Sequence, residues 1–216
     1  MKRILALSCA SLMLGCSGFS KLDWSTLGRD TWQRPADVVA ALELHPGDQV
    51  ADLGAGDGYF VERLSQAVGP DGTVYAVEVD AELVDELSQR FPPEQTNVEA
   101  VHGAFEDPRL PDGSVDLVLI VNTYHHIEDR PAYFRRLKQD LSAQGRVAVI
   151  EPNEDLGGVL SLALDEGHTS SAPAVELEMQ DAGYVVEQRH EFLPVQIFRV
   201  FEPNADAGPR PSADAG

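Results

Sequence analysis

Residues 50–60 read Val-Ala-Asp-Leu-Gly-Ala-Gly-Asp-Gly-Tyr-Phe, and this stretch decides the fold. An apolar strand runs into Asp52, and glycines follow at every second position, at Gly54, Gly56 and Gly58. Glycine has no Cβ, so a backbone built from it can approach a ligand closely and adopt positive φ at little cost. The residues after the last glycine continue with helical spacing. A strand, a glycine turn and a helix N-terminus in this order predict a cradle for a cofactor.

The spacing of the glycines separates two classes of cofactor. The dinucleotide-binding pattern is G-x-G-x-x-G, whereas here the third glycine comes one residue early and Tyr59 follows it. An acidic residue also precedes the first glycine by two positions. The pattern D-x-G-x-G-x-G resembles motif I of the class I S-adenosylmethionine (SAM) methyltransferases. A nucleotide-dependent oxidoreductase is the alternative that this spacing disfavours.

The rest of the chain alternates strands and helices, which predicts a parallel sheet with right-handed crossovers. The resemblance implies an α/β, Rossmann-like sheet of seven strands in the order 3-2-1-4-5-7-6, with helices on both faces and the ligand near strands one and four. The last two strands are expected to form an antiparallel hairpin. The predicted strands are 49–53, 73–79, 98–102, 115–121, 146–150, 184–191 and 195–201, and the predicted helices are 32–44, 59–68, 81–90, 130–141 and 174–182.

Carboxylates beside the glycine turn are the next candidates for the cofactor site. Glu78 ends the strand after the turn, where an acid can accept hydrogen bonds from ribose hydroxyls. Alternatively, Glu78 or Asp80 caps the following helix, and Asp80 is the better placed N-cap. Asp52 either lies near the ammonium group of SAM or braces the glycine loop by accepting its N–H groups. The resemblance implies this cofactor-binding set: Asp52, Gly54, Ala55, Gly56, Gly58, Glu78, Val79, Glu106 and Asn122.

The adenine end of the predicted site departs from the pattern of the family. Many relatives have Gly-Asp after the third strand, with the carboxylate on the adenine amino group, but here Ala104 follows Gly103. Glu106 or Asp107 could take over that contact from a displaced loop, and Phe105 could pack on the ring. Alternatively, this acidic loop is simply solvated.

The fourth strand ends in Asn-Thr-Tyr-His-His-Ile at residues 122–127, where relatives face the methyl acceptor. This is not the N-P-P-Y motif of the enzymes that methylate amino groups of nucleic-acid bases or of protein glutamine. Tyr124, His125 and His126 are therefore the candidate catalytic residues, which would orient an acceptor or take its proton. One of the two histidines could instead be an ordinary loop residue. No metal site is expected, because adjacent residues of an extended stretch point to opposite sides.

The acceptor is expected to be a small molecule. The net charge of −20 disfavours nucleic acid, since proteins that bind nucleic acid carry basic patches. Trp32 and His168 are weaker candidates for the acceptor pocket. The resemblance spans about residues 30–201 and leaves the acceptor open, although arsenite is disfavoured because the cysteines for it are missing. A monomer or weak dimer is expected. The alternative function is a non-catalytic lipoprotein that keeps the SAM-binding fold.

The N-terminus resembles a bacterial lipoprotein signal. A positive start, Met1-Lys2-Arg3, precedes an apolar run over 4–14, and Gly15 then stands directly before Cys16. A lipid on Cys16 would anchor the protein in the cell envelope, as its one membrane contact. The alternatives are a secretory signal without a lipid, a mis-assigned start codon, and a cytoplasmic protein whose signal is not used. The expected parts are a signal peptide at 1–15, a tether at 16–31, a methyltransferase domain at 32–201 and a disordered tail at 202–216.

Overall fold

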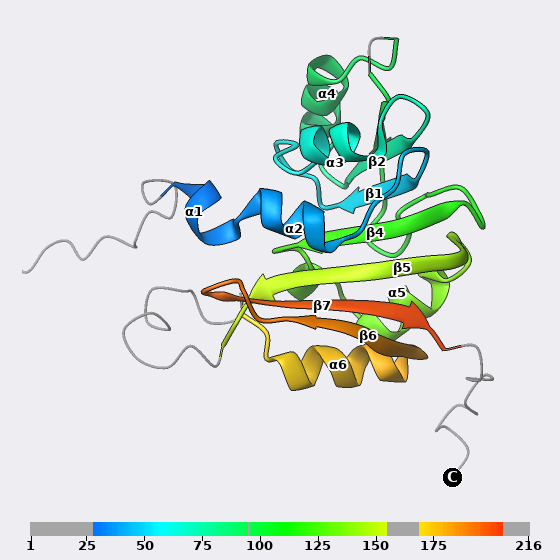
Figure 1. The fold of residues 1–216 in the computed structure, drawn as a ribbon. Helices are drawn as coiled ribbons and strands as arrows, with labels where there is room; N and C mark the ends of the chain where they lie inside the picture. The colour runs from blue at the N-terminus through cyan, green and yellow to red at the C-terminus, as the bar shows by residue number, and fades with distance from the viewer. Residues whose placement is uncertain (1–27, 95, 155–168, 205–216) are drawn as a thin grey trace, which may run out of the picture.

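The computed structural model describes residues 28–94, 96–154 and 169–204. These residues form a seven-stranded sheet in the order β3-β2-β1-β4-β5-β7-β6, as predicted (Figure 1). The strands are β1 Gln49–Leu53, β2 Thr73–Glu78, β3 Val98–His102, β4 Val115–Val121, β5 Leu141–Pro152, β6 Tyr184–His190 and β7 Gln196–Pro203. The helices are α1 Arg29–Gln33, α2 Pro35–Ala41, α3 Val61–Val68, α4 Ala81–Arg90, the short 3₁₀ turn η1 Tyr124–His126, α5 Arg130–Leu137 and α6 Ala172–Asp181.

The first five strands run parallel to one another, and β6 runs in the same direction, whereas β7 runs in the opposite direction between β5 and β6. β1 lies between β2 and β4, and β4 pairs with β5, all parallel. β7 is antiparallel to both β5 and β6, as expected for a terminal hairpin. The carboxyl ends of β1, β2, β4 and β5 therefore meet at one edge of the sheet. This edge, on the side of α1 in Figure 1, is where the predicted site residues gather.

Each face of the sheet has its own hydrophobic core. Helices α2, α3 and α4 cover one face, where Leu42, Leu64 and Leu87 are buried. Helices α5 and α6 cover the other face, where Phe134 and Met179 are buried. Burying one such side chain stabilises the fold by about 1.5–3 kcal/mol. The central strand β4 is buried on both faces along nearly its whole length, which explains why its sequence is apolar at every position except Asp116.

The helix predicted in the segment 32–44 is α2, which begins at Pro35, and Arg34 separates it from the shorter helix α1. Arg34 adopts φ 45° and ψ 55°, between α1 and α2. Pro35 follows it, and the proline ring disfavours the helical conformation of the residue before it. Helix α1 also begins at Arg29, inside the segment predicted as a tether.

Several element boundaries differ from prediction. The helix predicted over 130–141 ends at Leu137, and β5 starts at Leu141 rather than at 146. The carbonyl groups of Gln139 and Asp140 turn away to accept hydrogen bonds from the backbone of residues 113–115, which ends the helix and starts the strand. β7 runs to Pro203, so the first residues of the predicted tail belong to the sheet.

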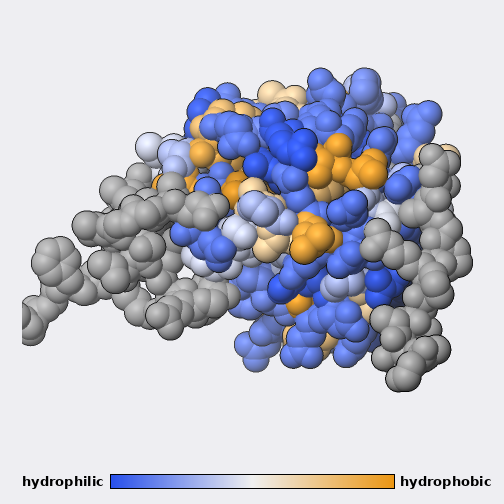
Figure 2. Space-filling view, turned by 90° about the horizontal axis from the view of Figure 1, so that it is seen from below, coloured by the Kyte–Doolittle hydropathy of each residue, from blue (hydrophilic) through white to orange (hydrophobic). Residues whose placement is uncertain are grey.

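Some predictions fall on residues that the structure leaves out. These are the signal peptide, Cys16, His168 and the tail from 205 onward. In the part of the chain that is described, no helix has the length and apolar character needed to cross a membrane. Figure 2 views the face that carries α6, where exposed side chains are mostly hydrophilic and apolar ones form small separate groups.

The glycine turn gives a first testable prediction, with a matched pair of variants. Gly54 has φ +77°, and a Cβ placed on it would lie 2.2 Å from Oγ1 of Thr123. Gly56 has φ +54°, and a Cβ there would meet nothing within 4 Å. We expect Gly54→Ala to lower the free energy of unfolding by roughly 2–4 kcal/mol and Gly56→Ala by only about 1 kcal/mol, because the second variant bears backbone strain alone. Urea unfolding measures both, and equal losses would contradict this account of the loop.

Candidate cofactor and acceptor site

The glycine loop between β1 and α3 is anchored on the neighbouring strand. The N–H groups of Gly54 and Ala55 donate to the carbonyl oxygen of Val77 at 2.9 and 3.0 Å. The three glycines all have positive φ, so the chain can turn sharply at the edge of the sheet. Gly58 is closed in by Phe91 of the α4 end, whereas Gly56 faces open space. The loop therefore has one packed side and one side open to a ligand.

Glu78 holds the open side of this loop. Its Oε2 accepts a hydrogen bond from the N–H of Gly56 at 3.1 Å, and its Oε1 accepts from the N–H of Val79 at 2.7 Å. Asp80 caps α4 by accepting from Glu82 and Leu83, as predicted. The carboxylate of Glu78 is thus fixed by backbone donors and still has lone pairs for ribose hydroxyls.

Asp52 lies buried beneath the loop and is only 3% exposed. Burial, with smaller contributions from the nearby charges of Glu78 and Asp57, raises its pKa to about 7, and Arg29 opposes this shift. Within the described part of the chain, no hydrogen bond to its carboxylate is found, so the loop N–H groups do not use it. This favours the interpretation in which Asp52 meets a cationic ligand group over the one in which it braces the loop.

Arg29 is a residue of this site that the sequence analysis missed. Its guanidinium lies 3.8 Å from the centre of the Tyr59 ring and 3.5 Å from Oδ1 of Asp57. Asp30 accepts a hydrogen bond from the Tyr59 hydroxyl and also pairs with Arg63 at 3.4 Å. These contacts fasten α1 onto the glycine loop. The sequence pattern did not reveal α1, because a helix of five residues is too short to show hydrophobic periodicity.

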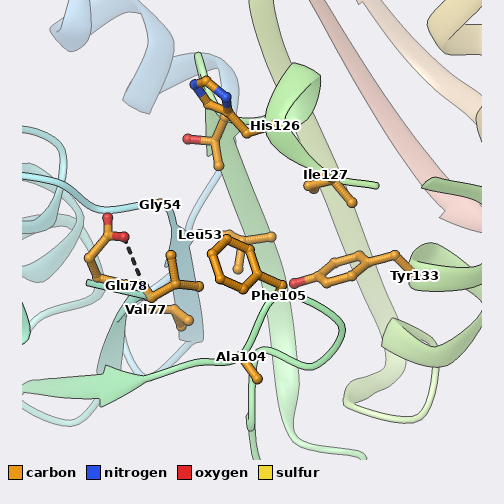
Figure 3. A pocket seen from close by; sticks show the side chains of 11 residues that line it. Leu53, Gly54, Val77, Glu78, Ala104, Phe105, His126, Ile127 and Tyr133 are labelled. Atoms are coloured by element: carbon orange, nitrogen blue, oxygen red, sulfur yellow. Dashed lines mark hydrogen bonds between the residues drawn. The ribbon is translucent and has the colours of Figure 1, made fainter. Parts of the chain in front are cut away.

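A hollow that is partly open to solvent lies beside the loop (Figure 3). Glu78 stands at one side of the hollow and Tyr133 at the other, with Phe105 between them in the view of Figure 3. The lining comes from four strand ends and from α5: Leu53, Gly54, Val77, Glu78, Val79, Ala104, Phe105, Thr123, His126, Ile127 and Tyr133.

The turn after β3 places the acids that were expected near adenine away from the hollow. Ala104 lines it, but Glu106 is exposed and is not among the lining residues. Asp107 pairs with Arg136 of α5 at 2.8 Å and accepts from the N–H of Arg109 at 2.7 Å. Neither acid stands in for the missing aspartate in this conformation.

The segment after β4 separates its predicted site residues into different environments. Asn122 has φ +54°, and its Oδ1 accepts from Nε2 of Gln196 at 2.8 Å. Tyr124 is buried in the core, stacked on Phe134, and its hydroxyl donates to Glu178 at 2.7 Å. Burial is also the main cause that raises the pKa of the Tyr124 hydroxyl. Tyr124 is therefore held as a structural residue, outside the lining of the hollow.

The two histidines lie at the boundary of two hollows. Nδ1 of His125 lies 2.7 Å from Oε2 of Glu151, a residue at the end of β5 that is fully buried. The other carboxylate oxygen of Glu151 accepts from the N–H of Tyr124 at 2.7 Å. His126 lines the cofactor hollow and also a second, more open hollow. The second hollow is lined by His125, His126, Ile127, Glu128, Asp129, Arg130, Pro131 and Glu178.

The sequence analysis did not single out Glu151 as a partner of His125. A signal was present, because Glu151 directly follows a predicted strand that neighbours β4 in the predicted order. Trp32 lies half-buried in α1 and is not among the described residues that line either hollow.

The chain resembles known methyltransferases in sequence. Residues 50–145 match a family model described as a methyltransferase domain. The ubiquinone/menaquinone biosynthesis C-methyltransferase UbiE of Xanthomonas campestris is 31% identical over 132 residues, which cover 57% of this chain and 49% of that protein. The chain therefore spans about half the length of the UbiE relatives that it matches.

Solved structures share the fold. A SAM-dependent methyltransferase from Aquifex aeolicus matches with a TM-score of 0.71 at 24% identity, covering 85% of this chain and 98% of that chain. A TehB-like SAM-dependent methyltransferase from Corynebacterium glutamicum matches with a TM-score of 0.61 at 18% identity, covering 84% and 92%. The strand order and the family match over residues 50–145, which includes the glycine loop, make this chain similar to the SAM-dependent methyltransferases in its fold and in the sequence of that segment.

Proposed function

We propose that this protein transfers a methyl group from SAM to a small molecule that must lose a proton, with His125 as the general base. The observation that carries this proposal is the pairing of His125 with buried Glu151 beside a hollow that adjoins the cofactor hollow. His126 and Ile127 line both hollows, so ligands in the two would lie close together.

The residues of the loop edge fit the cofactor. The open space beside Gly56 admits a ligand close to the backbone, and Glu78 offers a fixed carboxylate for ribose hydroxyls. Asp52, buried beneath the loop, suits the ammonium of the methionine part. SAM, when bound, supplies a methyl group on a cationic sulfur. The remaining work of the protein is to align the acceptor, exclude water and remove the acceptor proton.

The pairing of His125 with Glu151 suits proton removal. The two carboxylate oxygens of Glu151 face the N–H of Tyr124 and Nδ1 of His125. Because a carboxylate accepts hydrogen bonds, Nδ1 is assigned as the protonated ring nitrogen. Nε2 is then the basic nitrogen, and the carboxylate stabilises the imidazolium that forms when it takes a proton. A base of this kind helps only where the acceptor atom carries a proton, as in a hydroxyl, a thiol or an acidic carbon.

The chemical class of the acceptor follows from the second hollow. Glu128, Asp129 and Glu178 line it, and Arg130 pairs with Glu178 at 2.7 Å. A polar, uncharged or cationic small molecule suits this lining better than an anionic one. The C-methyltransferase relative supports including acidic carbon acceptors among the compounds tested.

The direct test is turnover with methyl-labelled SAM and a panel of small hydroxyl, thiol, amine and acidic-carbon compounds. We expect formation of S-adenosylhomocysteine that depends on one acceptor class with a removable proton. His125→Ala should lower this turnover by roughly 10²–10⁴-fold. Equal turnover in the variant would remove His125 from the mechanism, and turnover only on amines that are already unprotonated would contradict the need for a base.

The cellular location is a separate proposal, supported by the sequence around Cys16. We propose that the chain is exported and anchored by a lipid on this cysteine. In a bacterial host, we expect the protein to sediment with membranes and Cys16→Ala to move it to the soluble fraction. Cys9→Ala is the matched control, because it changes the other cysteine of the sequence, which lies inside the apolar run. Unchanged sedimentation of Cys16→Ala would contradict the lipid anchor.

A further inference from the structure

Phe105 is the most exposed large hydrophobic side chain among the described residues, with 74% of its surface accessible. It stands at the tip of a tight turn in which Ala104 and Asp107 exchange backbone hydrogen bonds at 2.7 and 3.2 Å. The ion pair between Asp107 and Arg136 fastens this turn to α5. The ring is thus held in solvent by an ordered turn, although an exposed aromatic ring forgoes the stabilisation that burial would give.

The ring stands at an apolar part of the cofactor hollow. Figure 3 shows Phe105 in front of Leu53, with Val77 to one side and Tyr133 to the other. Val79, on the strand end next to Glu78, is 39% exposed and lines the same hollow. An aromatic ring and aliphatic side chains that face one hollow can hold a flat, apolar ring between them.

The polar groups near this part of the hollow are already engaged. Glu78 is the one carboxylate among the described lining residues, and both of its oxygens accept from backbone N–H groups. Ala104 contributes only a methyl group. Asp107 faces Arg136, outside the lining. A purine bound beyond the ribose position would therefore meet hydrophobic surface and no side-chain carboxylate.

We propose that Phe105 covers the purine of the cofactor and that this chain holds the purine by stacking and apolar contact, without a side-chain carboxylate that reads the 6-amino group. This inference rests on the proposed function, because it assumes that SAM occupies the hollow. Stacking on an aromatic side chain tolerates different bases, since every base has a π face. The chain should consequently discriminate weakly between a 6-amino and a 6-oxo purine.

The test is calorimetric binding of S-adenosylhomocysteine and of its 6-oxo analogue S-inosylhomocysteine to the full-length chain. We expect the wild type to prefer the amino form by less than about tenfold, which is less than one well-placed buried hydrogen bond to a charged group contributes. Phe105→Ala should weaken both ligands to a similar extent, by about tenfold or more. Phe105→Tyr should retain both affinities. Leu177→Ala, which truncates an exposed side chain on α6 (59% accessible), should change neither.

A variant with a carboxylate in place of the Ala104 methyl group gives the sharpest comparison. Ala104→Asp should raise the preference for the amino form by about tenfold, because its oxygens accept from the amino group and repel the 6-oxo oxygen. Unchanged affinities in folded Phe105→Ala, or a wild type that already prefers the amino form by about a hundredfold, would overturn the inference while SAM binding stands. Binding of neither ligand would overturn the proposed function itself. Circular dichroism confirms that each variant is folded.

Discussion

Glu151→Gln is expected to lower methyl transfer by roughly 10²–10⁴-fold while leaving the affinity for S-adenosylhomocysteine nearly unchanged. The amide oxygen of glutamine can still accept from the N–H of Tyr124, so the local backbone keeps its hydrogen bond. The amide nitrogen then faces Nδ1 of His125 and donates to it. This reverses the tautomer and leaves Nε2 protonated, so the base is lost although the ring stays in place.

The measurement separates binding from catalysis. Single-turnover rates with labelled SAM report the chemical step, and calorimetry reports cofactor affinity. Asp140→Asn is the matched control, because Asp140 is also a fully buried carboxylate, paired with Arg136 at 2.6 Å, but it lies just before β5, at the opposite end from Glu151. A control variant that loses as much rate as Glu151→Gln would show that any buried carboxylate matters for folding. A Glu151→Gln variant with full rate would exclude the pairing from the mechanism.

Asp52→Asn is expected to weaken cofactor binding and at the same time to stabilise the folded protein above pH 7. The pKa of Asp52 is about 7 in the folded protein and near 3.8 in the unfolded chain. Between these values the folded state binds more protons than the unfolded state, so the stability of the wild type falls as pH rises through this window. The loss is complete above pH 7, where both states carry the charge.

The size of this effect follows from the shift. One pKa unit corresponds to about 1.4 kcal/mol, so the buried charge of Asp52 costs up to about 4 kcal/mol at pH 8. Asparagine removes this cost, and the difference between variant and wild type should shrink toward pH 4. For binding, an asparagine cannot neutralise an ammonium group, so the affinity for SAM should fall by at least about tenfold.

Urea unfolding at pH 5 and pH 8, together with calorimetric titration, tests both parts. Asp57→Asn is the matched control, since Asp57 lies on the same loop and pairs with Arg29, but its side chain is 70% exposed. We expect little change in its stability or binding. If Asp52→Asn is less stable than wild type at pH 8 and also loses binding, then Asp52 braces the loop, and the ionic role is wrong.

The sheet and the cofactor loop could be predicted from the sequence because their signals are local. The apolar runs of the parallel strands, and the glycine spacing at 54–58, each lie within a few residues of one another. The order of the strands then followed from the family resemblance. The start of α2 at Pro35 is also a local signal, because proline favours the first position of a helix.

The contacts between distant segments could not be predicted in the same way. Arg29 reaches the glycine loop from a short helix that was expected to be a tether. Tyr124 was expected to face the acceptor, but the 3₁₀ turn directs it into the core, where Glu178 and Phe134 receive it. Such pairings depend on how the helices pack on the sheet, and local patterns in a single sequence do not reveal that packing.

The central claim is that the glycine loop and Glu78 hold SAM, and calorimetric titration of the full-length chain with SAM tests it most directly. The wild type should bind SAM with a measurable heat, and Glu78→Ala should weaken binding by at least about tenfold, because the ribose hydroxyls lose a charged acceptor. Glu82→Ala, which removes an exposed acid from the first turn of α4, should bind like the wild type. A folded wild-type chain that binds no SAM, or undiminished binding in Glu78→Ala, would contradict the claim.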